Sequence, residues 1–209
     1  MSTPTAWSED HFIAGEVALD FANTVYRRTP EIGAELLDSA DALTGWLRRA
    51  ELLPAHDDAE HGFDDAGHGF DDAGHGFDDA AAALREARGI RERFWAIFEA
   101  QHDGRELPTN ALAGLLDTAR RGIDGNVAVG PDGSTTPRTA HGALTVLALR
   151  GIRLALSPLP QPVRACDRCG WFFIDTSRGR RRRWCSMKTC GNQAKAARYR
   201  SAHPGSATR

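Results

Sequence analysis

The chain has 209 residues, of which 41% are hydrophobic and 26% charged, which fits one ordinary domain plus an appendage, or two small domains. The formal net charge of −2 conceals an asymmetry, because residues 1–160 carry −12 and residues 161–209 carry +10. The absence of an apolar run of about 18 residues argues against a membrane protein. The first residues lack a basic and an apolar signal region, so we expect a cytoplasmic protein with reduced cysteines.

The first 160 residues are predicted to be mainly helical. Residues 15–25 fit either a short helix or a strand followed by a turn. Ser39 fits the N-cap of the next helix. Residues 125–139 alternate around a Pro131-Asp132-Gly133 turn, which predicts a small β-hairpin. Apolar residues at spacings of three and four predict further helices over about 80–101, after an N-cap at Thr109 or Asn110, and over about 140–156.

A tandem repeat interrupts this pattern. The motif HGFDDAG occupies residues 61–67 and 68–74 and recurs as HGFDDAA at 75–81. The spacing of seven fits a heptad, and the three histidines fit a metal site. Glycine and aspartate are poor helix formers, however, so we interpret residues of about 56–80 as a flexible acidic insert without an assigned function.

Three prolines, at positions 158, 160 and 162, predict a stiff linker after the last helix of the acidic part. We therefore predict one domain over residues 1–160 and a second over 161–209, the latter with a disordered tail. The N-terminal domain shows no phosphate-binding loop, nucleophile elbow or histidine–carboxylate metal spacing, so no catalytic residue is predicted.

The second domain contains all four cysteines, spaced C-x2-C, fifteen residues, C-x4-C. Two such pairs suit one tetrahedral Zn²⁺, and four protein ligands leave no open position, which is typical of a structural site. Such a small segment needs a metal because it cannot bury enough apolar area to fold alone. A redox switch on the same thiols is the alternative. The predicted ligands are Cys166, Cys169, Cys185 and Cys190.

Between the cysteine pairs, residues 171–176 and 180–184 are predicted to form a β-hairpin with its turn at 177–179, and a helix follows to about Ala202. The order knuckle, hairpin, helix is treble-clef-like. Five arginines within residues 178–183 fit either a solvated loop or a nucleic-acid contact, and a metal-held frame favours the contact. The predicted contact residues are Arg178, Arg180, Arg181, Arg182, Arg183, Lys188, Gln193, Lys195, Arg198 and Arg200.

These residues resemble a known family. The resemblance is carried by CGWFFIDTSRGRRRRWCSMKTCGNQAKAARYR, which is similar to the CGNR-type zinc finger of bacterial proteins over about residues 164–203. It implies that the four cysteines bind zinc, whereas Gln193 stands where the signature has arginine. The motifs ALDFANTV and LLDSADALTGWLRRAELL resemble the ABATE domain that usually precedes this finger. The resemblance implies a stress-related transcription regulator.

The sequence therefore predicts a mainly α protein, with a helical domain carrying a small β-hairpin followed by a treble-clef-like zinc finger. The leading hypothesis is a DNA-binding transcription regulator whose N-terminal domain senses a small molecule, forms a homodimer or contacts a partner. The alternatives are an RNA- or ribosome-associated zinc protein, with Trp171, Phe172 and Trp184 as stacking candidates, and an enzyme with an accessory finger.

Overall fold

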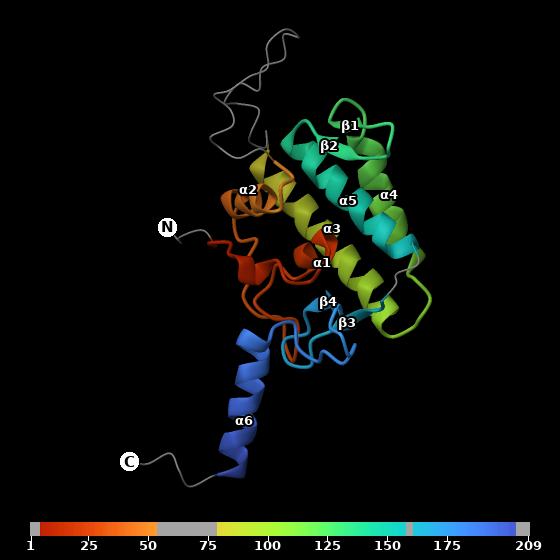
Figure 1. The fold of residues 1–209 in the computed structure, drawn as a ribbon. Coiled ribbons are helices and arrows are strands. Elements are labelled where there is room, and N and C mark those ends of the chain that lie inside the picture. The colour runs from red at the N-terminus through yellow and green to blue at the C-terminus, as the bar shows by residue number, and fades with distance from the viewer. Residues whose placement is uncertain (1–4, 54–78, 158–160, 204–209) are drawn as a thin grey trace.

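The computed structural model describes residues 5–53, 79–157 and 161–203. This part of the chain is mainly helical and contains two small antiparallel hairpins, which confirms the predicted fold class (Figure 1). The predicted acidic insert with its repeats, and the predicted disordered tail, lie outside the described residues. None of the described helices is long and apolar enough to cross a bilayer.

Three of the described helices begin after a residue whose side chain caps them. In α2 (Ala40–Arg49) the Ser39 hydroxyl accepts a hydrogen bond from the Ala42 amide at 3.1 Å, as predicted. Asp79 caps α3 (Ala80–His102) and Thr139 caps α5 (Ala140–Leu156) in the same way. Two further helices are α1 (Val17–Ala22), the helical alternative for residues 15–25, and α4 (Thr109–Gly122), whose N-cap is Pro108 rather than the predicted residues.

Helices α3, α4 and α5 form the helical body of the molecule (Figure 1). They pack closely where small residues face large ones: a Cβ atom on Gly151 of α5 would lie 2.1 Å from the Phe94 ring of α3. The predicted hairpin forms from β1 (Val127–Val129) and β2 (Thr135–Pro137), which pair antiparallel.

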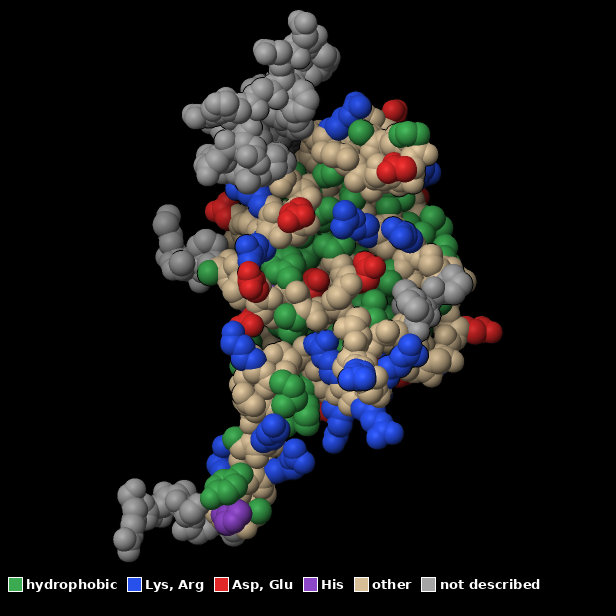
Figure 2. All heavy atoms as spheres, viewed as in Figure 1, with side chains coloured by type: hydrophobic (Ala, Val, Ile, Leu, Met, Phe, Trp, Pro, Cys, Tyr) green, Lys and Arg blue, Asp and Glu red, His purple; other side chains and the backbone are tan. Residues whose placement is uncertain are grey.

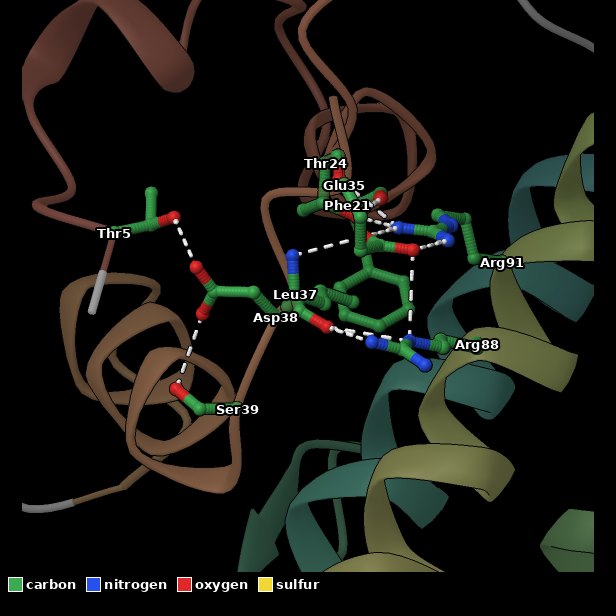
Figure 3. Close-up of polar contacts among 9 residues, drawn as sticks. All are labelled: Thr5, Phe21, Thr24, Glu35, Leu37, Asp38, Ser39, Arg88 and Arg91. Carbon is green, nitrogen blue, oxygen red and sulfur yellow. Dashed lines mark hydrogen bonds and ion pairs between the residues drawn. The ribbon is translucent and has the colours of Figure 1, made fainter. Parts of the chain in front are cut away.

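The loop between α1 and α2 is fixed to α3 by a partly buried ion pair (Figure 3). The Arg91 guanidinium donates to both Glu35 carboxylate oxygens, at 2.6 and 2.5 Å, and to the Thr24 carbonyl at 2.9 Å. Arg88 donates to the Leu37 carbonyl at 2.7 Å. Burial raises the pKa of Glu35, but its bonds to Arg91 outweigh that effect and lower it overall. Residues 24–37 are therefore held on α3.

The second hairpin differs from the prediction. Strand β4 (Phe172–Ile174) pairs with β3 (Val163–Ala165), which precedes the cysteines, and not with residues 180–184. Those residues do not form a strand. We call residues 177–184, which lead from the end of this hairpin to Cys185, the return segment. The buried Asp175 carboxylate holds this return instead, because it accepts hydrogen bonds from the amides of Ser177 at 3.0 Å and Arg182 at 2.8 Å. The predicted hairpin between the cysteine pairs is therefore wrong.

The C-terminal region (residues 161–203) divides into a buried part and an exposed part. Phe172 and Phe173 are buried in a core that is continuous with the helical body, and the Phe172 and Phe98 rings lie 5.9 Å apart. By contrast, α6 (Asn192–Ala202) extends away from the body and has no buried residue (Figure 1). The predicted domain boundary near residue 160 stays a prediction.

Candidate metal centre and basic surface

The four cysteines converge on one point. Cys166 and Cys169 lie in the tight connection between β3 and β4, residues 166–171, which we call the cysteine connection. Cys185 follows the return segment, and Cys190 lies in a helical turn, Met187–Gly191. Their sulfur atoms all lie within 4.8 Å of one another, with 3.5 Å between Cys169 and Cys185 and 3.6 Å between Cys185 and Cys190. All four side chains are buried.

This arrangement fits one tetrahedral zinc ion. A zinc–sulfur distance of about 2.3 Å places the ligand sulfurs of a tetrahedral site about 3.8 Å apart, close to the spacing found here. Hydrogen bonding from Cys169 lowers the pKa of Cys166, while bonding to Cys166 raises the pKa values of Cys169 and Cys185. The four sulfurs thus compete for negative charge, and a divalent cation would let them be thiolates together.

Local backbone features shape the connection between the cysteines. Gly170 has a φ of +73°, and a Cβ atom there would lie 2.9 Å from the Thr29 side chain. Both the left-handed conformation and the close approach require glycine. Ser186 accepts a hydrogen bond from the Lys188 amide at 3.1 Å and starts the turn that carries Cys190. Helix α6 continues directly from that turn.

Arg182 lies inward. Its guanidinium donates to the Trp184 carbonyl at 2.8 Å and to the Cys185 carbonyl, and it lies 4.5 Å from the centre of the Phe173 ring. These contacts fix the chain at a predicted metal ligand, so the side chain of Arg182 is already engaged within the protein.

Two other predicted contact residues form ion pairs at the surface. Arg183 pairs with Asp167 at 2.6 Å and lies 5.5 Å from the Trp184 ring, and Lys188 pairs with Asp10 at 3.2 Å. Both cations remain largely exposed, so these contacts hold them only weakly.

The remaining predicted contact residues form an exposed basic surface along the return segment and α6, visible over the lower part of the molecule (Figure 2). Within the described part of the chain their side chains make no ion pair or hydrogen bond. We call the following set the free basic residues: Arg178, Arg180, Arg181, Lys195, Arg198 and Arg200. Gln193 is likewise exposed on the first turn of α6.

Sequence analysis missed Arg168, which is also exposed and unpaired within the described residues. It lies between Cys166 and Cys169, and the two residues between the ligands of a C-x2-C connection face outward here, because Asp167 and Arg168 are exposed while both cysteines are buried. That spacing is the signal that could have identified it.

The aromatic side chains proposed for base stacking are occupied. Trp171 is buried and its indole donates to the Val25 carbonyl at 2.8 Å, and Phe172 is 1% exposed. Trp184 is half-buried beneath Arg183. These three rings support the structure of the region rather than offering a surface for unpaired bases.

Two family models match the chain. The CGNR zinc finger model matches residues 163–203, and the ABATE model, described as "Putative stress-induced transcription regulator", matches residues 15–159. A search of curated proteins gave no match.

Proposed function

The chain belongs to the ABATE family and carries a CGNR zinc finger, and from this premise we propose that it is a zinc-dependent, DNA-binding transcription regulator. One structural zinc ion would be held by the four converging sulfurs of Cys166, Cys169, Cys185 and Cys190. Bound zinc supplies the charge that keeps the four sulfurs together as thiolates and links the connection, the return segment and α6.

The exposed basic surface carries the proposal for DNA. The free basic residues are exposed on the return segment and on α6, next to a framework whose base is buried. Phosphate groups would attract these cations, and the exposed helix α6 has the diameter that the major groove accepts. Lys195 and Arg198 are three residues apart and share one face of α6. We propose that they and Gln193 face the bases or the adjacent phosphates.

We assign a different role to the helical domain. Residues 1–160 carry −12, which opposes contact with a polyanion. We therefore propose that this domain senses a ligand or mediates oligomerisation while the finger binds DNA. RNA binding by base stacking is less well supported, because the three candidate aromatic side chains are engaged inside the protein.

A binding titration tests the proposal. The zinc-loaded full chain should bind duplex DNA in preference to structured RNA, and its affinity should fall steeply as the salt concentration rises. Removing zinc with a chelator should abolish binding. Preference for structured RNA, or DNA binding that survives complete zinc removal, would overturn the proposal. Genome-wide mapping of bound DNA, with Cys185→Ser as the control, would then identify the targets.

A further inference from the structure

A short segment of the helical domain contacts the cysteine connection directly. The Asn23 side-chain amide donates to the Phe172 carbonyl at 2.8 Å, and its oxygen accepts from the Phe172 amide at 2.8 Å. The Asn23 side chain therefore pairs with β4 as the backbone of a neighbouring strand would. Asn23 is 2% exposed, so both bonds are shielded from water.

The residues that follow Asn23 add three backbone contacts to the same place. The Val25 carbonyl accepts from the Trp171 indole at 2.8 Å. The amides of Arg28 and Thr29 donate to the carbonyl of Cys169, at 2.6 and 3.3 Å. The carbonyl of a predicted metal ligand is thus bound by the helical domain.

The Arg28 side chain completes the contact. It donates to the Gly170 carbonyl at 3.2 Å, and its guanidinium lies 4.0 Å from the centre of the Phe172 ring. It also pairs with Glu99 of α3 at 3.3 Å. Burial lowers the pKa of Arg28, although its interaction with Glu99 opposes this shift. Arg28 therefore connects α3 to the cysteine connection.

We propose that residues 23–29 form a knuckle clamp that supplies the outer layer of the metal site and so makes zinc retention by the finger depend on the helical domain. Groups that orient metal ligands commonly change metal affinity by about 10- to 100-fold when they are removed. This inference rests on the zinc site of the proposed function. The clamp positions the ligands and does not touch the metal.

The clamp is itself held rigidly. The Arg91–Glu35 pair and the Arg88–Leu37 bond fix the far side of the same loop to α3 (Figure 3). A movement of α3 relative to α1 would therefore pull on Cys169 through the loop. This gives the helical domain a physical route by which its conformation changes zinc retention and the orientation of α6.

Transfer of zinc from the loaded full chain to a colorimetric chelator tests the clamp. We expect Asn23→Ala to release zinc about 10- to 100-fold faster than the wild type. Asn126→Ala is the matched control, because the Asn126 side chain also makes two hydrogen bonds, to Thr139 and to the Asp124 carbonyl, but it lies between α4 and β1. The control should release zinc at the wild-type rate.

A second pair of variants keeps the test decisive if Asn23→Ala does not fold. Arg28→Ala removes the contacts with Gly170 and Phe172 but keeps the backbone bond to Cys169, and Arg28→Lys should restore part of the lost zinc retention. Wild-type release rates in the clamp variants, or equal acceleration in Asn126→Ala, would overturn the clamp alone. A wild-type chain that binds no zinc would overturn the proposed metal site, and the clamp with it.

Discussion

The two halves of the zinc finger contrast in how they relate to the rest of the protein. The cysteine connection and β4 lie in the common core, where Phe172 and Phe173 are buried and Asn23 pairs with the backbone. Helix α6 has no buried residue and extends into solvent (Figure 1). One half therefore serves as an anchor, and the other is free to bind a partner.

The arginines divide along the same line. Arg182 points into the anchor and bonds to the carbonyls of Trp184 and Cys185, whereas its neighbour Arg181 is exposed and unpaired within the described part of the chain. The neighbouring residues Arg181 and Arg182 therefore differ in what their side chains contact. Variants of each half should accordingly change different measured quantities.

Loss of the metal should have the largest effect. Structural zinc contributes about 10–16 kcal/mol of apparent binding free energy in small zinc-dependent folds. We expect Cys185→Ser to disorder the finger and, because the connection shares a core with the helical body, to lower the melting temperature of the whole chain. Circular dichroism and hydrogen exchange of residues 163–203 would measure this.

The exposed Thr176→Ser on the same loop is the control, and it should leave both measurements unchanged. A Cys185→Ser protein that keeps the wild-type melting temperature and amide protection without metal would show that the anchor does not need zinc.

Arg182→Ala should have the next largest effect. It removes hydrogen bonds from a charged donor to two carbonyls and a stacking contact with Phe173, which together are worth about 2–4 kcal/mol of unfolding free energy. Arg181→Ala is the matched control and should change stability by less than about 0.5 kcal/mol. Chemical denaturation would measure both. Equal stability of the two variants would contradict the inward role of Arg182.

The buried Asp20 should make the anchor sensitive to pH. Desolvation raises the pKa of Asp20 to about 7, against opposing hydrogen bonds from the Ala14 and Ile13 amides. The folded state therefore binds a proton that the unfolded state releases near pH 4, so this contribution to stability is lost as the pH rises toward about 7. Ala14 in turn accepts a bond from the Ile174 amide of β4 at 2.9 Å.

Raising the pH from 6 to 8 should lower the unfolding free energy of the zinc-loaded wild type by about 1–2 kcal/mol, because Asp20 binds a proton in the folded state but not in the unfolded state at the lower end of this range. Asp20→Asn keeps an acceptor for the Ala14 amide but cannot ionise, so this loss should disappear in the variant. Denaturation at both pH values would measure the difference. The same pH dependence in both proteins would show that Asp20 is ionised throughout.

Local signals were sufficient to predict most of the helices and the cysteine cluster, whereas for residues 15–25 they left a helix and a strand both open. Ser39 and Thr139 cap helices through bonds to residues three positions away, and the cysteine spacing alone indicated convergence. The pairing of β4 was not predictable in this way, because its partner β3 is only three residues long and directly follows the last proline of the predicted linker. The partner was decided by Asp175, which binds the amides of the return segment.

The clamp and the orientation of the arginines were beyond local signals. Asn23 and Phe172 are 149 positions apart, and nothing near Asn23 in the sequence indicates a partner in the finger. Residues 180–184 are not a strand, so the alternation expected of a strand could not indicate which arginines face outward. Arg182 turns inward because unpaired carbonyls of Trp184 and Cys185 lie within its reach.

The smallest effect on stability is expected at the exposed basic surface. Arg178→Ala combined with Arg181→Ala removes two unpaired surface cations, so the unfolding free energy should change by less than about 0.5 kcal/mol. The affinity should nevertheless fall for every DNA sequence. The slope of log affinity against log salt concentration should become shallower by about 2, because each lost phosphate contact removes about 0.9 from it.

The exposed pair Arg120→Ala and Arg121→Ala on α4 is the matched control, since it removes the same charge far from the finger along the chain. This control should keep the wild-type salt slope. If both double variants reduce the slope equally, overall charge determines DNA binding and the return segment is not part of the interface. If only the Arg178–Arg181 variant does so, the return segment contacts the phosphates, as its exposed and unpaired arginines indicate.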